Sequence, residues 1–311
     1  MSRPFRFGIT TSDAGSRAEW TDRARRVEDL GFSTLTVPDH LRASLAPMPA
    51  LVSAAAATTR LRVGTNVLNN DLRHPVLVAR EAATIDLLTD GRLELGLGAG
   101  YARVEYDQAG LDYSAGGVRV ERLAEAVTIV SRLLEGGPVT FAGRYYRVTE
   151  HAVHPRPVQR PRPPLMIGGN GPRLLALAAA AADIVSLSGI TFRRGGSEPD
   201  LSAWKAGGVD ERMRTLRAEA GDRWPQLELG ALVQRVIVTD DRRAAAEELA
   251  RRWPQLTVDD LLQAPFVLLG TVDQIAEDLI VRRERWGLSY HVVFEAALEV
   301  VAPVVARLAG R

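Results

Sequence analysis

The feature that most constrains the fold is a repeated alternation between short apolar runs and segments with helical periodicity. In the first helical segment, apolar side chains recur three or four residues apart, at Trp20, Ala24, Val27 and Leu30. Ser16-Arg-Ala-Glu19 at its start and Thr271-Val-Asp-Gln274 later in the chain have the spacing of capping boxes. Strand-like runs occur at residues 5–10, 34–37, 61–68, 93–97, 165–168, 184–187, 227–238 and 290–294.

Eight strand–helix pairs in a chain of 311 residues predict an α/β fold, a (β/α)₈ TIM barrel with insertions. Helical crossovers make neighbouring strands parallel, and the apolar runs suit strands buried on both faces. The competing fold is a doubly wound sheet, which binds its ligand at a single switch point. We predict one domain over residues 1–311. It has an insertion at about 136–164, read as a hairpin and a Pro-rich solvated connector, and a long loop at about 188–208.

Composition excludes several classes of function. The formal net charge of +1 argues against a nucleic-acid-binding surface. The absence of cysteine excludes disulfides, thiolate metal sites and cysteine nucleophiles, and no cluster of residues has metal-ligand spacing. No apolar run is long enough to span a membrane, and the first residues do not have the pattern of a signal peptide. We therefore expect a cytoplasmic protein with no membrane partner.

Four polar or glycine-rich segments follow predicted strands, where a barrel places its active site. Asp39-His40 supplies a carboxylate and an imidazole that titrates near neutrality. The alternative interpretation is structural, with Asp39 as a capping residue and His40 as an ordinary loop histidine. Asn66 supplies an amide at the tip of the third strand, or is merely a polar strand end. Gly96-Leu-Gly-Ala-Gly100 has no dinucleotide-binding spacing, and its alternate glycines predict a floor without side chains for a flat ring.

The fourth segment, Gly168-Gly-Asn-Gly171-Pro172, joins a strand to a helix. Free N–H groups at such a helix start can bind phosphate, and the alternative is an ordinary tight turn. Walker residues are absent, so nucleoside triphosphate hydrolysis is disfavoured. Arg193-Arg194 in the following long loop could meet an anionic cofactor tail or be solvated.

Taken in order, five segments resemble the bacterial luciferase-like monooxygenase superfamily, and most closely its branch that depends on the deazaflavin coenzyme F420. No single segment is specific, but the ordered set covers nearly the whole chain. The segments are Val37-Pro-Asp-His40, Arg62-Val-Gly-Thr-Asn-Val67, the helix start at residues 75–84, the Gly-rich run at residues 91–100 and Ile167-Gly-Gly-Asn-Gly-Pro172.

The resemblance implies a homodimeric barrel that holds coenzyme F420 at the carboxyl ends of its strands. It places His40 beside the ring as proton donor or acceptor. It also implies a non-proline cis peptide at the tip of the third strand, Asn66-Val67. The residues it implies as cofactor contacts are Asp39, Asn66, Val67, Ala99, Gly100, Gly168, Gly169, Asn170, Gly171 and, as a weaker match, Ser188.

One departure separates this chain from the sugar-phosphate dehydrogenases of the branch, in which a glutamate follows the strand-four glycines. Tyr101 occupies that place here. A tyrosine hydroxyl is a poor acid at pH 7, but it can orient a carbonyl group, so we assign Tyr101 a catalytic position. The departure predicts a substrate other than a sugar phosphate.

Three hypotheses for function follow. The first is an F420-dependent oxidoreductase that moves a hydride between the deazaflavin and a small organic substrate, with His40 exchanging the proton. The second is a monooxygenase that uses FMN supplied in reduced form by a partner reductase. The third is an inactive barrel that binds a cofactor or a partner. Side-by-side binding of the two cofactors separates them.

Overall fold

The computed structural model describes residues 3–42, 44–192 and 199–311. Its chain forms two compact units, each described by itself below. The first unit comprises residues 11–26 and 34–167, and the second comprises residues 1–10, 27–33 and 168–311. Helix α1 (Arg17–Asp29) contributes residues to both. The prediction of one domain over residues 1–311 stays a prediction.

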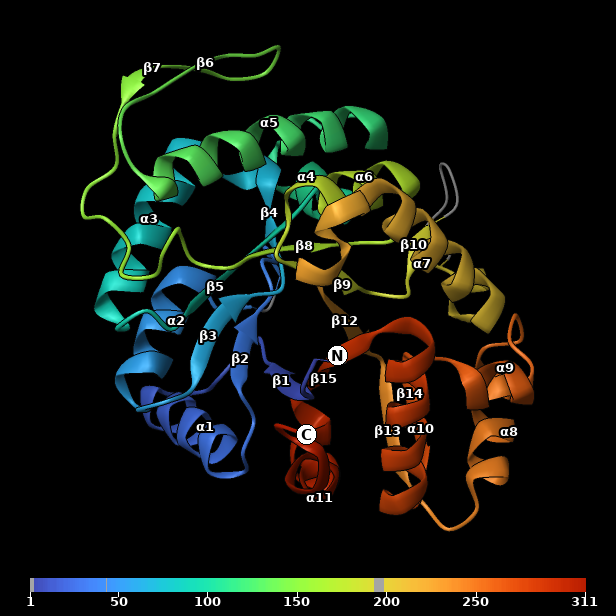
Figure 1. Ribbon diagram of the computed structural model, residues 1–311. Helices are drawn as coiled ribbons and strands as arrows, with labels where there is room; N and C mark the ends of the chain where they lie inside the picture. Colours follow the sequence, from blue (N-terminus) through green and yellow to red (C-terminus); the bar gives the residue numbers. More distant parts are fainter. Residues whose placement is uncertain (1–2, 43, 193–198) are drawn as a thin grey trace. The chain divides into compact units, whose positions relative to one another are not determined.

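The first unit is built on parallel strands whose side chains are almost wholly buried. Its strands are β2 (Thr34–Val37), β3 (Arg62–Thr65), β5 (Leu93–Gly98) and β8 (Leu165–Gly168), with the short β4 (Leu68–Asn69) beside the end of β5. Helices α2 (Pro47–Ala56), α3 (Pro75–Leu88) and α5 (Gly116–Glu135) pack against them (Figure 1). Burial on both faces explains why these strands read as continuous apolar runs.

The second unit has the same construction. Parallel strands β1 (Arg6–Thr10), β15 (Leu288–Phe294), β12 (Glu228–Val233) and β9 (Ile184–Leu187) pair in that order. Its helices include α6 (Pro172–Ala181), α7 (Ala206–Ala220), α10 (Val272–Trp286) and α11 (Leu298–Leu308). The two ends of the chain meet in this unit, where the Phe5 amide donates to the Arg311 carbonyl at 3.0 Å.

Along the chain, eight parallel strands alternate with helices, which confirms the predicted (β/α)₈ barrel with insertions. One predicted strand was wrong, because residues 227–238 form two strands that part at Gln234. The second of them, β13 (Arg235–Val238), pairs with β14 (Val267–Gly270) in a separate two-stranded sheet. The sequence analysis also missed α4 (Arg103–Ala109), α7 and α9 (Val258–Gln263). Helix α8 (Arg242–Arg252) follows β13.

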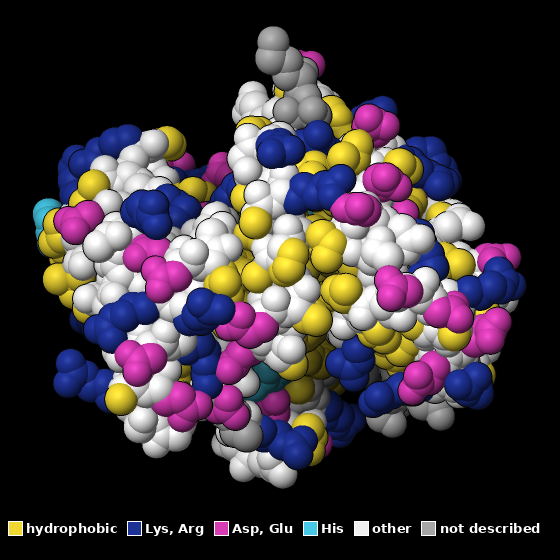
Figure 2. Space-filling model, turned by 90° about the horizontal axis from the view of Figure 1, so that it is seen from below, with side chains coloured by type: hydrophobic (Ala, Val, Ile, Leu, Met, Phe, Trp, Pro, Cys, Tyr) yellow, Lys and Arg dark blue, Asp and Glu magenta, His cyan; other side chains and the backbone are white. Residues whose placement is uncertain are grey.

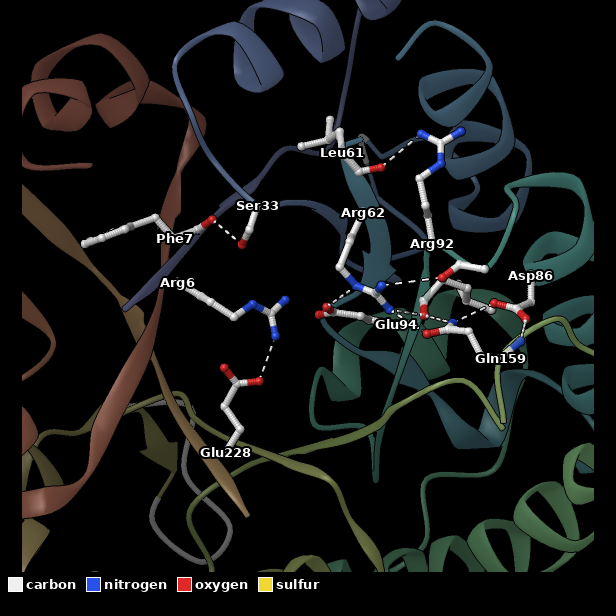
Figure 3. A network of polar contacts seen from close by, with 12 residues as sticks. Arg6, Phe7, Ser33, Leu61, Arg62, Asp86, Arg92, Glu94, Gln159 and Glu228 are labelled. Atoms are coloured by element: carbon white, nitrogen blue, oxygen red, sulfur yellow. Dashed lines mark hydrogen bonds and ion pairs between the residues drawn. The ribbon is translucent and has the colours of Figure 1, made fainter. Parts of the chain in front are cut away.

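The insertion begins with the predicted hairpin, β6 (Val139–Ala142) and β7 (Arg147–His151). The connector that follows is not simply solvated. The Gln159 side chain donates to Asp86 Oδ1 at 2.6 Å and to the Leu93 carbonyl at 2.8 Å, and it accepts from Arg62 at 3.0 Å. Figure 3 shows Gln159 between Asp86 and the Arg62–Glu94 pair. The connector is therefore fixed to the amino-terminal ends of β3 and β5.

The two predicted capping boxes differ. At Thr271 both reciprocal bonds are present, so that box is confirmed. At Ser16 the hydroxyl accepts from the Glu19 amide at 3.1 Å, but the Glu19 carboxylate accepts from the Gly15 amide at 2.8 Å. Half of that prediction was wrong, because the carboxylate also binds Arg23 and reaches one residue further back.

The segment predicted as one long loop, residues 188–208, carries structure of its own. Strands β10 (Thr191–Phe192) and β11 (Pro199–Asp200) pair antiparallel, and a 3₁₀ turn, η2 (Ser202–Trp204), leads into α7. Arg193 and Arg194, considered above for an anionic tail, lie outside the described residues.

Charge on the molecular surface follows the composition. Figure 2 shows Lys and Arg side chains interspersed with Asp and Glu over the face that it presents. Within the described ranges, no helix is both long enough and apolar enough to cross a membrane.

Candidate active site

Asp39 and His40 follow β2, whose four residues are buried and which Pro38 ends. The Asp39 side chain is only 3% exposed. Its Oδ2 accepts from the Arg73 guanidinium and from the Asn69 amide, the latter at 3.1 Å. These bonds fix the segment after β3. Asp39 thus acts first as an anchor of the strand-end loops, and its predicted cofactor contact stays a prediction.

His40 projects between two polar side chains that come from beyond β5. Its Nδ1 lies 2.8 Å from Glu105 Oε1, and its Nε2 lies 3.4 Å from the Tyr101 hydroxyl oxygen. Glu105 is 7% exposed, whereas the His40 side chain is 32% exposed. Because a carboxylate only accepts, Nδ1 carries the proton and Nε2 is the nitrogen available to exchange one.

Glu105 is the functional residue that the sequence analysis missed. It lies in α4, and its second oxygen accepts from the Leu41 amide at 3.2 Å. One carboxylate therefore holds both the His40 ring and the backbone beside it. A carboxylate therefore contacts His40 from four residues beyond Tyr101. The signal in the sequence was an acidic residue shortly after the strand-four glycines. It was overlooked because α4 is short and polar and therefore lacks the apolar periodicity that indicates a helix.

Tyr101 packs its ring edge-on to the His40 ring, with centroids 5.7 Å apart and planes at 88°. The residue is 55% exposed overall. Burial around its hydroxyl and the negative charge of Glu105 raise the pKa of Tyr101 above 10. The phenol is therefore neutral at pH 7, and its O–H can donate a hydrogen bond to His40 Nε2 or to a bound substrate.

The tip of the third strand carries the non-proline cis peptide that the resemblance implies, between Asn66 and Val67. The Asn66 amide nitrogen of the backbone donates to the Val37 carbonyl at 3.2 Å. The side-chain nitrogen Nδ2 of Asn66 is buried and has no hydrogen-bond partner in the described part of the chain. Leaving a buried donor without a partner costs free energy. A bound ligand with a hydrogen-bond acceptor would remove that cost.

The predicted glycine floor on β5 was wrong. A Cβ at Gly96 would lie 1.9 Å from the Thr65 carbonyl oxygen, and one at Gly98 would lie 2.4 Å from a Val67 methyl. The space that these glycines leave is filled by the third-strand tip rather than open to a ring. Gly100 similarly admits the Tyr106 hydroxyl, and Ala99 beside it is half-buried. Sequence cannot show which neighbour uses the space beside a glycine.

In the second unit, the glycine-rich turn leads from β8 into α6. Asn170 is 7% exposed, and its side-chain nitrogen donates to Ser188 Oγ at 2.8 Å and to the Ile190 carbonyl at 3.0 Å. Its oxygen accepts from the Gly189 amide at 3.3 Å. The Asn170 amide thus ties the β8 turn to the β9 turn, which leaves backbone N–H groups of α6 as the candidate phosphate donors.

The three glycines of that turn differ in the room beside them. Gly169 has φ of +147°, and a Cβ on it would lie 2.0 Å from a Leu174 methyl. Gly171 is the N-cap of α6, with φ of −70° and no atom within 4 Å of a built Cβ. The open side of the turn is therefore at Gly171, while Gly168 ends β8.

The structure brings His40, Tyr101, Asp39 and Asn66 together with Glu105 at the carboxyl ends of β2, β3 and β5 in the first unit. It brings Gly169, Asn170 and Ser188 together in the second unit. Among the described residues, no group of three or more His, Asp and Glu side chains could hold a metal ion.

Comparison with known proteins places these features in a family. Residues 1–257 match the family described as luciferase-like monooxygenase. The F420-dependent glucose-6-phosphate dehydrogenase of Microbacterium testaceum (strain StLB037) is 35% identical over 192 residues, which are 59% of this chain and 56% of that protein. The match therefore spans only about half the length of that relative.

Solved structures share the fold over nearly the whole chain. The coenzyme F420-dependent tetrahydromethanopterin reductase of Methanopyrus kandleri has a TM-score of 0.77 at 19% identity, covering 98% of this chain and 99% of that one. An F420-dependent secondary alcohol dehydrogenase, solved with an F420–acetone adduct, has a TM-score of 0.74 at 20% identity, covering 97% and 99%. With a family match over residues 1–257 and this fold, the chain belongs to the luciferase-like monooxygenase family.

Proposed function

We propose that this protein is an F420-dependent oxidoreductase in which His40 exchanges a proton with a small organic substrate. The observation that carries the proposal is the His40–Glu105 pair, a 2.8 Å contact that leaves Nε2 of a partly exposed imidazole facing Tyr101. The relative from Microbacterium testaceum bears an F420-dependent name, which supports this cofactor over FMN.

Each residue of the pair has a distinct task. Coenzyme F420, when bound, supplies the hydride chemistry. His40 Nε2 takes the proton from a substrate hydroxyl when an alcohol is oxidised, or gives it to a carbonyl oxygen when one is reduced. Glu105 holds the proton on Nδ1 and compensates the positive charge that forms on the ring. Tyr101 donates its O–H to the substrate oxygen.

Several groups on this chain fit the cofactor. The open side of Gly171 and the backbone N–H groups at the start of α6 would hold a phosphate. The buried Asn66 Nδ2 would gain an acceptor from a carbonyl of the deazaflavin ring. By contrast, the side chains of Asp39 and Asn170 already have protein partners, so we assign them to positioning the loops.

The experiment is a titration of the purified protein with coenzyme F420 and, in parallel, with FMN, followed by cofactor fluorescence. We expect saturable F420 binding that is at least tenfold tighter than FMN binding. Tighter FMN binding would favour the flavin-dependent monooxygenase, and no binding of either by folded protein would favour the inactive barrel. The Glu105→Gln variant should bind F420 normally and turn over more slowly, since the amide keeps only one of the two acceptors.

A further inference from the structure

A cavity of about 220 Å³ lies in the second unit, at the carboxyl ends of its strands. Its walls come from the turn after β9, from η2, from the β12–β13 junction, from the end of α8 and from the last residue of β15. A (β/α)₈ barrel binds its substrates at this end of the strands. The lining residues are Ile190, Leu201, Trp204, Gln234, Arg235, Trp253 and Phe294.

Aromatic rings form most of the wall. Trp204 is 1% exposed and meets Trp253 edge-on, with ring centroids 5.0 Å apart and planes at 71°. Phe294 is 42% exposed, an unusual position for a phenylalanine at the end of a core strand. Aromatic walls and two aliphatic side chains favour a flat apolar ligand, because rings gain from edge-on and offset contacts beyond the area that they bury.

Contacts with neighbouring residues fix the wall of the cavity. Gly189, with φ of +73°, lets the Trp204 and Phe266 rings close over the backbone, since a Cβ there would lie 2.8 Å and 2.7 Å from their atoms. The Gln234 side chain donates to the Ser188 carbonyl at 3.1 Å and to the Leu232 carbonyl at 3.3 Å. These contacts fix the wall before any ligand arrives, which reduces the entropic cost of binding.

Among the described residues that line this apolar cavity, Arg235 is the one that carries a positive charge. Arg235 is exposed, and within the described residues its guanidinium contacts only the neighbouring Gln234 carbonyl, at 3.4 Å, with no carboxylate within 4 Å. By contrast, the part-buried Arg242 on α8 pairs with Asp278 at 2.7 Å. An unpaired guanidinium next to aromatic rings can bind a planar carboxylate through two parallel hydrogen bonds.

We infer that this cavity is a ligand-binding site of the second unit, and that its ligand is a planar aromatic molecule with one anionic group, such as an aromatic carboxylate. The rings of Trp204, Trp253 and Phe294 would hold its apolar part, and Arg235 its charge. The inference goes beyond the proposed function, because it assigns a separate binding site to the second unit. A sugar phosphate does not fit this wall, because its hydroxyl groups would lose water against apolar side chains with few acceptors to replace it.

The test is calorimetric titration of the full-length protein with three probes. They are 2-naphthoate, the neutral 2-naphthalenemethanol and glucose 6-phosphate. We expect 2-naphthoate to bind most tightly, 2-naphthalenemethanol about three- to tenfold more weakly, and glucose 6-phosphate not measurably. Equal or tighter binding of glucose 6-phosphate would overturn the inference.

Two variants at exposed positions locate the probe without disturbing the core. Arg235→Gln should weaken 2-naphthoate about three- to tenfold and leave 2-naphthalenemethanol within twofold. Phe294→Ala should weaken both ring probes by about two- to tenfold. The matched controls are Arg251→Gln on α8 and Leu88→Ala on α3, both exposed and outside the cavity. Equal effects of a variant and its control would place the probe elsewhere and overturn the inference.

Repeating the titration with saturating coenzyme F420 separates this inference from the proposed function. We expect 2-naphthoate to bind the F420-loaded protein. Loss of that binding would show that the cavity belongs to the cofactor, which overturns the ligand assignment and leaves the F420 proposal intact. If F420 fails to bind while 2-naphthoate binds as expected, the proposed function fails and the cavity assignment stands.

Discussion

The two ends of the parallel strands in the first unit are both rich in charged residues, but they use them differently. At the amino-terminal ends, Arg62 donates to Glu94 at 2.6 Å, to the Leu93 carbonyl and to Gln159 (Figure 3). Glu94 is 1% exposed and Asp86 is fully buried. At the carboxyl ends, Glu105 is also buried, yet it contacts a histidine whose side chain is 32% exposed.

This difference separates stability from chemistry. In the amino-terminal network, buried carboxylates meet donors on both oxygens, as Asp86 does with Gln159 Nε2 and with the amides of Val158 and Gln159. Such a network holds the strand ends and the connector together. The carboxyl-terminal cluster instead ends at His40 Nε2, the atom to which we assign the proton exchange. We therefore expect substitutions at one end to alter unfolding and substitutions at the other to alter turnover.

The largest effect should come from His40→Ala. Removing the group that exchanges the proton should lower kcat by about 10²- to 10⁴-fold, while the free energy of unfolding changes by less than about 1 kcal/mol. Turnover would be followed by F420 absorbance with the best substrate from a panel of aromatic alcohols, aldehydes and enones, and unfolding by urea titration. A variant as active as the parent would remove His40 from the mechanism.

The opposite end should give the opposite result. Glu94→Ala leaves Arg62 without its carboxylate and should lower the free energy of unfolding by about 3 kcal/mol. The kcat of the protein that remains folded should stay within twofold. Glu277→Ala, at an exposed position on α10, is the control and should stay within about 0.5 kcal/mol. A stability loss no larger than the control's would break the comparison.

The sequence predicts the fold better than the candidate site, because the fold depends on local patterns and the site on contacts between distant segments. The barrel was predictable because buried parallel strands and their helices leave apolar periodicity in the chain. Residues 165–168 and 184–187 form strands with the predicted bounds. The resemblance also implied the cis peptide at Asn66–Val67. These are local or family-wide features.

The chemistry of the site was less predictable, because it depends on contacts between distant segments. Glu105 was missed since its importance lies in reaching His40, 65 residues earlier in the chain. The glycine floor was wrong because Val67, on another segment, occupies the space beside Gly96 and Gly98. The homodimer and the partner reductase, which the sequence comparison alone suggested, stay predictions.

A second histidine extends the comparison to the second unit. His291 lies on β15, fully buried beside the Phe5 and Phe7 rings. Burial and then the positive charge of Arg282 lower the pKa of His291 to about 3. In the unfolded chain this histidine has a pKa near 6.5. Between pH 6.5 and about pH 3 it is therefore protonated in the unfolded state and neutral in the folded state. Acid therefore favours unfolding across this window, by up to about 1.4 kcal/mol per pH unit.

His291→Leu removes this titration and should flatten the loss of stability between pH 6.5 and 4.5. The measurement is urea unfolding of parent and variant at several pH values, with His151→Leu, at an exposed position at the end of β7, as the control. If parent and His291→Leu lose stability in parallel, His291 does not govern the acid side of the stability curve.

The smallest expected effect tests the phosphate-binding turn. The same substitution should stabilise the fold and weaken the binding of coenzyme F420. Gly169 is unsuitable for this test, because any side chain there meets Leu174. Gly171→Asp adds a carboxylate at the open N-cap of α6, where Asp favours the helix and should slightly raise the free energy of unfolding. The same charge should repel the phosphate of coenzyme F420 and raise its Kd about tenfold. Gly171→Ala, which adds no charge, should leave the Kd within twofold. If Gly171→Asp stabilises the protein and binds F420 as tightly as the parent, the helix start is intact and the phosphate lies elsewhere.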